Sequence, residues 1–312
     1  MDKKFGVIAL VGAPNAGKST LSNSLLGQKV TITSPKVQTT RNVIKAILVE
    51  NDTQLVILDT PGVFLPRSDK ILERVIVKSA WQGIRSADFV CLLIDAQQGL
   101  NEENLRILKD LQKDGFSPAA IINKVDLVKK EKLLTVAGQL IENGIEDIFM
   151  ISALQKDGID KLKEFMLSKC NSGQWQYDED DITDMPIKAM ATEITREKLF
   201  MHLEQELPYC ITVKNDSFEI KNGLLIIHQS ILVTKENQKG IVLGKNGSLL
   251  KQVGSESRKD ITEISGLKTS LYLHVKVKKD WMSHVENYEI ADIDKFPKNK
   301  PVKNKSTKNK KK

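Results

Sequence analysis

The residues whose types and spacing most clearly indicate a chemical role form a glycine-rich stretch near the start of the chain, GAPNAGKST at positions 12–20. The stretch fits the pattern G-x-x-x-x-G-K-S of a phosphate-binding loop and stands between an apolar run and a helical pattern, as that loop requires. Its backbone N–H groups can surround phosphates, while a lysine neutralises charge and a serine binds Mg²⁺. The predicted nucleotide contacts here are Gly12, Ala13, Pro14, Asn15, Ala16, Gly17, Lys18, Ser19 and Thr20.

A second set of polar residues follows the apolar run 55–58. Asp59 stands where a carboxylate can hold Mg²⁺ through water, and Gly62 can offer its N–H to a terminal phosphate. Asp, Pro and Gly all favour turns, so an ordinary turn at a strand end is the alternative. We assign this stretch to the nucleotide site, with the residues Asp59, Thr60, Pro61, Gly62 and Val63.

A third set, Asn123, Lys124 and Asp126, can select the base. Asp126 can accept hydrogen bonds from N1–H and the exocyclic amine of guanine, whereas adenine lacks that pattern and would leave the carboxylate unpaired. Asn123 would tie the loops together, and the stem of Lys124 would cover the face of the base. A downstream tripeptide completes the set, with its central N–H directed at guanine O6: Ser152, Ala153 and Leu154.

The elements that must position these loops belong to an α/β domain. Up to about Cys170, apolar runs of strand length alternate with longer helical patterns, which predicts βαβ units and a mostly parallel sheet with helices on both faces. Such sheets bind ligands at the carboxyl ends of their strands, so the three sets of residues should meet there. The predicted strands are 5–11, 55–58, 89–94, 119–122 and 148–151.

The sequence changes character over residues 171–187, which are rich in Asp and Glu and have little apolar periodicity, as is typical of a linker. Beyond it we predict a helix over 192–207, a strand over 209–213 and a hairpin turn at Asn222 and Gly223. A strand over 224–233, two helical stretches and a strand over 271–278 follow, which gives the order α-β-β-α-α-β.

A GxxG loop lies between the two helical stretches of this second domain. Two glycines three apart are a weak signal alone, and a packing corner with solvated lysines is the alternative. The position strengthens the signal, because such a loop in this element order resembles the type II KH domain, which clamps single-stranded RNA. The candidate RNA contacts are Gly244, Lys245, Asn246 and Gly247 with the nearby cations Lys239, Lys251 and Arg258; Lys259 adds further basic charge.

The segments 12–19, 39–41, 59–62 and 123–126 resemble those of the Era family of bacterial GTPases, and the resemblance extends to about Trp281. It implies a P-loop, Ras-like GTPase domain followed by a smaller α+β type II KH domain. It also implies GTP hydrolysis with Mg²⁺ and binding to small-subunit (16S) ribosomal RNA near its 3′ end during assembly of that subunit.

The same resemblance assigns roles around the γ-phosphate. The hydroxyl of Thr40 would ligate Mg²⁺ together with Ser19, and Asp59 would lie near the metal. Thr39 is the alternative to Thr40. The residues expected to act directly in hydrolysis are Lys18, Thr40 and Gly62.

Three features of the sequence modify this expectation. Val63 stands where Ras relatives carry a water-orienting glutamine, so we expect slow intrinsic turnover. Asn15 resembles the asparagine with which some related GTPases hold K⁺ beside the phosphates, which makes K⁺ a candidate cofactor. The GxxG loop reads Gly-Lys-Asn-Gly, whereas the familiar order in the family is Gly-Asn-Lys-Gly, and this leaves open which side chain faces the RNA.

The basic charge of the chain is concentrated in its tail. The formal net charge of +7 comes from 47 basic and 40 acidic residues, and eight of the lysines lie in residues 297–312. This tail cannot bury a core and is predicted to be disordered. It could attract RNA or adhere to anionic lipid, so a membrane-surface signalling GTPase is the rival interpretation. A metabolic nucleotide kinase is disfavoured because it would not explain the guanine selector.

Composition sets the remaining expectations. No apolar stretch is long enough to span a bilayer, and three dispersed cysteines fit a reducing cytosol and argue against a zinc site. We therefore expect a cytoplasmic monomer that can associate peripherally with the cytoplasmic face of the membrane. The expected divisions are a GTP-binding domain at 1–170, the linker at 171–187, the KH-type domain at 188–282, a C-terminal segment at 283–296 and the tail.

Overall fold

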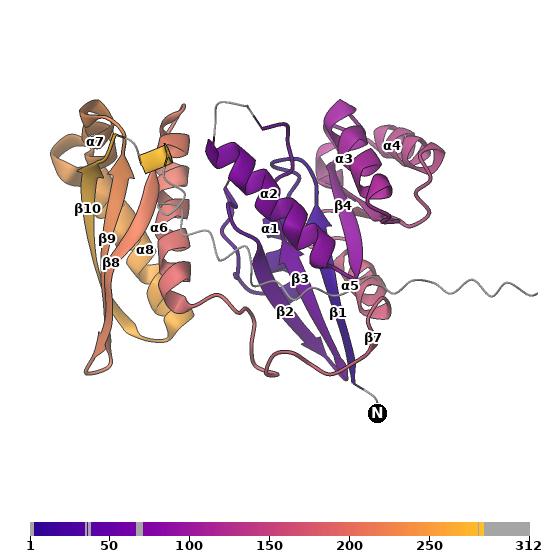
Figure 1. The fold of residues 1–312 in the computed structure, drawn as a ribbon, viewed down its shortest axis with the longest axis horizontal. Helices are drawn as coiled ribbons and strands as arrows, with labels where there is room; N and C mark the ends of the chain where they lie inside the picture. The colour runs from indigo at the N-terminus through magenta and orange to yellow at the C-terminus, as the bar shows by residue number, and fades with distance from the viewer. Residues whose placement is uncertain (1–2, 35, 37–38, 67–70, 280, 284–312) are drawn as a thin grey trace, which may run out of the picture.

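The computed structural model describes residues 3–34, 36, 39–66, 71–279 and 281–283. Residues 284–296 and the lysine-rich tail, for which the sequence predicts a C-terminal segment and disorder, lie outside the described residues. The described part of the chain forms two units, each built on its own sheet (Figure 1).

The sheet of the first unit runs in the order β2-β3-β1-β4-β5-β6. Neighbouring strands on this path are parallel except for β2 and β3, which confirms the predicted mostly parallel sheet. Of the six strands on this path, the antiparallel edge strand β2 has no counterpart among the predicted strands. The bounds are β1 (Lys4–Val11), β2 (Ile44–Glu50), β3 (Thr53–Asp59), β4 (Phe89–Asp95), β5 (Ala119–Asn123) and β6 (Ile148–Ile151).

Helices cover both faces of this sheet, so its central strands β1, β3, β4 and β5 are buried on both sides and consist mainly of apolar residues. In β1, Ile8 and Leu10 belong to one core cluster, while Ala9 and Val11 belong to the other. The first cluster takes residues from α1 (Lys18–Leu26) and α5 (Ile159–Ser168). The second takes residues from α2 (Ile71–Ser86), α3 (Glu102–Lys113) and α4 (Lys130–Glu142).

The segment between the units lies along the sheet. Its first part, β7 (Asn171–Ser172), pairs antiparallel with the start of β1. The fully buried Gln54 of β3 then accepts hydrogen bonds from the backbone N–H groups of Gln176 and Tyr177, and its amide donates to the Tyr177 carbonyl. Near its end the segment bridges β2 at Ala46. These contacts hold the segment against the first unit at its start, at residues 176–177 and near its end.

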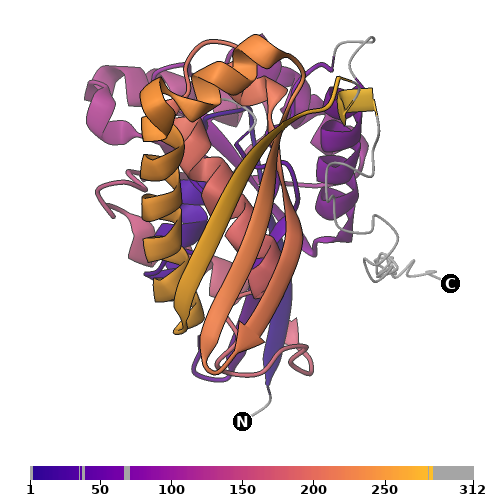
Figure 2. The same ribbon diagram turned by 90° about the vertical axis from the view of Figure 1, so that its left-hand side faces the viewer.

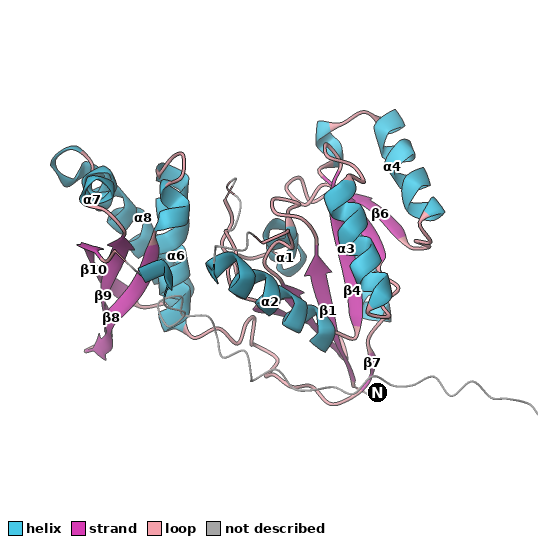
Figure 3. Ribbon diagram, turned by 45° about the horizontal axis from the view of Figure 1, so that its top comes forward, coloured by secondary structure: helices cyan, strands magenta, loops and turns pink. Residues whose placement is uncertain are grey.

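The second unit places three helices on one face of a three-stranded sheet in the order β10-β9-β8 (Figures 2 and 3). Strand β8 is antiparallel to β9, and β9 is parallel to β10. The predicted order α-β-β-α-α-β is confirmed. The bounds are α6 (Ile187–His202), β8 (Thr212–Lys221), β9 (Leu224–Val233), α7 (Glu236–Leu243), α8 (Ser248–Ser265) and β10 (Lys268–Val277).

Several boundaries in this unit differ from the sequence prediction: α6 begins at 187 and not at 192, β8 extends to 221 and not to 213, and β10 spans 268–277 and not 271–278. Helix α6 ends at His202 instead of 207, because Leu203 adopts an extended conformation and buries its side chain in the core. A 3₁₀ turn over Leu207–Cys210 follows, so β8 begins only at Thr212. The predicted hairpin turn is confirmed, since Asn222 and Gly223 have φ angles of 50° and 74°, the left-handed values that a tight two-residue turn needs.

The two units share an apolar cluster. Leu72 and Ile76 of α2 pack with Leu232 of β9 and with Trp281, whose side chain is fully buried. Burial of an indole of this size removes a large apolar area from water. The cluster therefore anchors the end of the second unit on α2 of the first.

Candidate nucleotide site and RNA-binding loop

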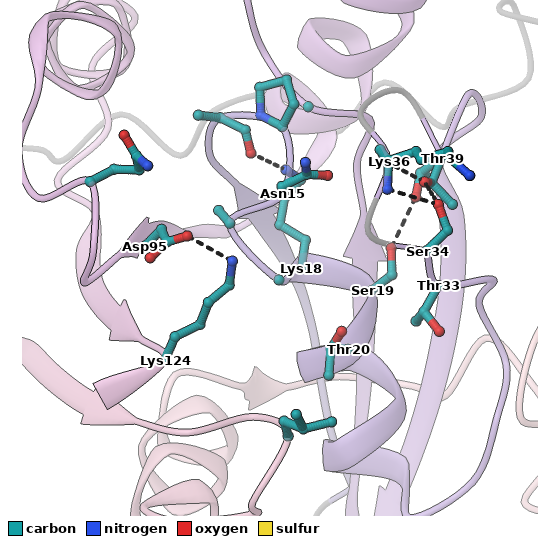
Figure 4. A pocket seen from close by; sticks show the side chains of 18 of the residues that line it. Asn15, Lys18, Ser19, Thr20, Thr33, Ser34, Lys36, Thr39, Asp95 and Lys124 are labelled. Atoms are coloured by element: carbon teal, nitrogen blue, oxygen red, sulfur yellow. Dashed lines mark hydrogen bonds and ion pairs between the residues drawn. The ribbon is translucent and has the colours of Figure 1, made fainter. Parts of the chain in front are cut away.

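A cavity of about 780 Å³ opens at the carboxyl edge of the first sheet (Figure 4). Its position matches the expectation that the loops after the parallel strands meet there. The predicted site residues that line it are residues 13–20, Thr39, Thr40, Gly62, Lys124 and Leu154. Other lining residues, which the sequence did not single out, are Ile32, Thr33, Ser34, Lys36, Asp95, Gln98, Asn101, Glu103, Asn104 and Met201.

The phosphate-binding loop adopts the geometry that its glycines permit. A Cβ on Gly12 would lie 2.4 Å from the carbonyl oxygen of Leu93, so no larger residue fits there. Gly17 has φ 98° and directly precedes α1, whose first N–H groups are available to an anion. The Nζ of Lys18 donates to the carbonyl oxygens of Gly12 (3.0 Å) and Ala13 (2.9 Å).

Lys18 is buried, and burial lowers the pKa of its ammonium to about 8, although the nearby carboxylates of Asp59 and Glu103 oppose that shift. A cation held in a dry site interacts strongly with an anion placed beside it. The loop therefore offers a phosphate both oriented N–H donors and a poorly solvated positive charge.

The residues expected around Mg²⁺ are brought together. The hydroxyls of Ser19 and Thr40 lie 2.9 Å apart. The hydroxyl of Thr39 instead bonds to Ser34 and to the carbonyl of Lys36, so the structure places Thr40, and not Thr39, beside Ser19.

The carboxylate of Asp59 fits a metal site. It is fully buried, and neither of its oxygens has a regular hydrogen-bond partner among the described residues. Burial raises its pKa to about 6, against the opposing influence of the nearby Ser19, Lys18 and Thr31 side chains. A hard divalent cation would compensate such a charge, and hydroxyl and carboxylate oxygens are the ligands that Mg²⁺ prefers.

The stretch after Asp59 is held mainly by structural contacts. The hydroxyl of Thr60 donates to the carbonyl of Leu10 (2.6 Å). Val63 is buried in the apolar core, and its N–H donates to the carbonyl of Gly12 (3.1 Å). A Cβ on Gly62 would lie 2.8 Å from the backbone of Pro14. Of the five residues predicted here, only Gly62 therefore lines the cavity, and the Val63 side chain faces away from it.

The loops that are predicted to select the base meet at Asn123, which is buried at the end of β5. Its amide donates to the carbonyl of Ala16 (2.9 Å), and its carbonyl oxygen accepts from the N–H of Ala153 (3.0 Å). Asp126 is exposed in a 3₁₀ turn, and Leu154 is three-quarters exposed. Like Ser152 and Ala153, Asp126 lies outside the cavity lining.

Lys124 shows a partner that the sequence analysis missed. Its Nζ lies 2.7 Å from a carboxylate oxygen of Asp95, the last residue of β4 (Figure 4). Asp95 ends its strand as Asp59 and Asn123 end theirs, and this repeated position is the signal that could have identified it. Met201 has no such signal, because it comes from α6 of the second unit.

The GxxG loop lies between α7 and α8 and exposes Lys245 and Asn246. Asn246 has φ 53° and Gly247 has φ 75°, which turns the chain directly into the N-terminus of α8. A Cβ on Gly244 would approach the Leu249 Cβ to 2.7 Å. Of the other candidate contacts, Lys251 and Arg258 are exposed on α8, and Lys239 is partly buried on α7.

Comparisons with known proteins agree with this division. Residues 7–124 match the family model described as 50S ribosome-binding GTPase, and residues 206–282 match the KH domain. GTPase Era from Bradyrhizobium sp. strain BTAi1 is 44% identical over 95% of this chain and 96% of its own length. GTPase Era from Rickettsia bellii strain OSU 85-389 is 41% identical over 92% of this chain and 97% of its own length.

Solved structures give the same result. A crystal structure of Era in complex with MgGDPNP and nucleotides 1506–1542 of 16S ribosomal RNA matches with a TM-score of 0.87. A single-residue variant of Aquifex aeolicus Era bound to GDP.AlF4⁻ also matches with a TM-score of 0.87. Both are 35% identical to this chain and cover 91% of it and 97% of their own lengths. By sequence and by fold, the chain belongs to the Era family of GTPases.

Proposed function

We propose that this protein is a GTP-hydrolysing switch that binds 16S ribosomal RNA near its 3′ end through the GxxG loop and assists assembly of the small ribosomal subunit. The observation that carries the proposal is the joint presence of a cavity lined by the phosphate-binding loop and of a KH-type loop in one chain. The similar Era structure with MgGDPNP and a 16S fragment supports the choice of both ligands.

In the first unit, Lys18 and the N–H groups of its loop would hold the phosphates, and Gly62 would donate to the γ-phosphate. Ser19 and Thr40 would ligate Mg²⁺, with Asp59 holding it through water. When bound, the cation supplies charge stabilisation for the transferring phosphoryl group. Val63 is buried and cannot orient the attacking water, which supports slow intrinsic turnover.

In the second unit, Lys245 and Asn246 would contact the sugar-phosphate backbone, with Lys251, Arg258 and Lys239 adding positive potential. The N–H groups at the start of α8 add donors for phosphate oxygens. Gly244 and Gly247 allow the backbone to approach the RNA closely.

The rival function, signalling at a membrane surface, depends on the lysine-rich tail, which lies outside the described residues. Among the described helices, none has the length and apolar character needed to cross a bilayer. Cross-linking followed by sequencing of bound RNA tests the proposal. Enrichment of 16S sequences near the 3′ end is expected, and recovery on anionic liposomes without ribosomal RNA would favour the rival.

The first prediction concerns base choice. Asp126→Asn should weaken GTP binding at least ~100-fold and increase affinity for XTP, because an amide can donate to the extra carbonyl of xanthine that a carboxylate repels. Titration of the parent and variant with both nucleotides measures the change. An unaltered preference for GTP would show that Asp126 does not select the base.

The second prediction concerns the buried carboxylate of Asp59. Because its folded-state pKa is raised to about 6, its ionisation destabilises the nucleotide-free protein above that pH and does so progressively less as the pH falls. Asp59→Asn should therefore stabilise the nucleotide-free protein at pH 7.5 by about 2 kcal/mol and by less at pH 5.

Calorimetry with and without Mg²⁺ and GDP separates this effect from ligand binding. The extra stability that Mg²⁺ gives in the presence of nucleotide should shrink in the Asp59→Asn variant, since a metal partner is lost. Unchanged stability at both pH values would contradict the assigned cost of ionisation.

The third prediction concerns K⁺. If Asn15 helps to hold K⁺ beside the phosphates, hydrolysis should be faster in K⁺ than in Na⁺ at matched ionic strength, because a positioned cation compensates the charge that an arginine stabilises in other GTPases. Asn15→Ala should remove this difference. Equal rates in the two salts for the parent protein would exclude the role.

The fourth prediction concerns the RNA loop. Replacing Lys245 and Asn246 together by Asp should lower 16S RNA affinity at least ~10-fold, about 1.4 kcal/mol, because carboxylates repel the phosphate chain. Asp tolerates the left-handed conformation at position 246, so the loop should keep its shape.

The chain supplies a matched control for this pair. Lys221 and Asn222 precede Gly223 at the β8–β9 turn, as Lys245 and Asn246 precede Gly247, and Asn222 is also left-handed. Replacing Lys221 and Asn222 by Asp makes an equal change in net charge at a site away from the GxxG loop. Equal loss of RNA affinity in both variants would mean that only overall charge matters, and GTP binding should persist in both.

A further inference from the structure

The loop over residues 29–41 carries Thr40 into the nucleotide site, but its described residues form no helix or strand. Contacts with neighbouring elements must therefore determine where Thr40 lies. From the first unit, the Asn23 side chain accepts from the N–H groups of Val30 and Thr31, and the Thr31 hydroxyl donates to the Ser19 carbonyl.

The second unit supplies further contacts, chiefly from α6, which faces the first unit (Figure 1). Lys36 donates to the carbonyls of Phe200 and Leu203 at the C-terminal end of α6, where a cation is favoured. Arg41 donates to the carbonyl of Ile211 (3.2 Å). The loop is thus held from both units.

Glu197 of α6 makes the most specific of these contacts. One of its carboxylate oxygens lies 2.5 Å from the Nζ of Lys29, and the other accepts the N–H of Thr33 at 2.8 Å. Its side chain is fully buried, whereas that of Lys29 is 36% exposed. Lys29 also reaches Asp260 of α8 at 3.3 Å.

A buried carboxylate is strongly destabilising when its partners are removed, because it has lost its hydration. Lys198 of the same unit lies 3.6 Å from Glu197 but 2.7 Å from Asp260, so Lys29 is the closer cation for Glu197. Opening of the loop would remove both Lys29 and the Thr33 N–H from this carboxylate and leave it with Lys198 at 3.6 Å. The cost of losing these two closer partners therefore favours the conformation in which Thr40 lies beside Ser19.

We propose that Glu197, a residue of the RNA-binding unit, is a positioning residue for the GTPase site: it holds residues 29–33 so that Thr40 stays beside Ser19. Its effect is specific to the nucleotide state that uses Thr40, which is the one with a γ-phosphate and Mg²⁺. Lys29 also contacts Asp260 on α8, the helix that begins at the GxxG loop. Lys29 therefore links the loop that carries Thr40 to the helix that follows the proposed RNA-binding loop. This inference rests on the proposed GTPase function.

The test compares Glu197→Gln with Lys29→Met in the full-length protein. Each should lower kcat for GTP about 5-fold, raise the Mg²⁺ concentration required for half-maximal activity by a similar factor, and release a non-hydrolysable GTP analogue faster. Release of GDP should change less than 2-fold in both, since GDP does not need Thr40. Glu197→Gln is the safer variant for folding because it removes the buried charge, whereas Lys29→Met takes the nearest cation from the fully buried Glu197 carboxylate.

The double variant and a control complete the experiment. If Glu197 acts through Lys29, the double variant should be little worse than either single one. Glu256→Gln, which alters a carboxylate of α8 hydrogen-bonded to His202 and Gln252 within the second unit, should leave all values within 2-fold of the parent.

The possible results distinguish a failure of the positioning role of Glu197 from a failure of the proposed GTPase function. A parent protein without GTPase activity would overturn the proposed function. An active parent with a normal Lys29→Met variant, or with equal effects on GTP and GDP release, would overturn the positioning role and leave the GTPase assignment in place. Additive effects in the double variant would equally reject it, because they would mean that the two residues act separately.

Discussion

The nucleotide site depends on one buried amide. The side chain of Asn123 binds the phosphate loop through the Ala16 carbonyl, its own loop through the N–H of Lys124, and the last loop through the N–H of Ala153. These bonds use both ends of the amide, so no other residue of similar size would make them all. Gly17 follows from the same constraint, because a Cβ there would lie 2.2 Å from the Asn123 nitrogen. The phosphate-binding loop and the two loops predicted to recognise the base are therefore joined in one assembly.

Around this assembly, the charged groups are placed at a cost to the protein. Lys18 and Asp59 are both buried. Burial lowers the pKa of Lys18 and raises the pKa of Asp59, and both shifts favour the neutral form of the side chain. In a folded protein of ordinary stability, such groups are retained where a ligand compensates them. The ligand with matching charges is a phosphate chain with a divalent cation, which joins the electrostatics of the site to its chemistry.

The sequence was sufficient for the parts of the site that depend on local pattern. The phosphate loop, Asp59 and Asn123 follow apolar runs, and the rule that parallel strands end at one edge brings them together without further information. The edge strand β2 escaped prediction, and so did Asp95, whose partner Lys124 is distant along the chain. Met201 could not be predicted, because its place in the cavity depends on how the second unit packs on the first.

That packing joins two different kinds of contact. The apolar cluster around Trp281 attaches the second unit to α2, and its contacts do not require an exact orientation of the side chains. The contacts of Glu197, with one oxygen on Lys29 and the other on the Thr33 N–H, are directional and lost with small displacements. An apolar anchor can survive a change of orientation that the polar contacts cannot. If Glu197 positions the loop as proposed, loss of these polar contacts would release Thr40 without complete separation of the units, and the nucleotide site would be coupled in this way to the second unit.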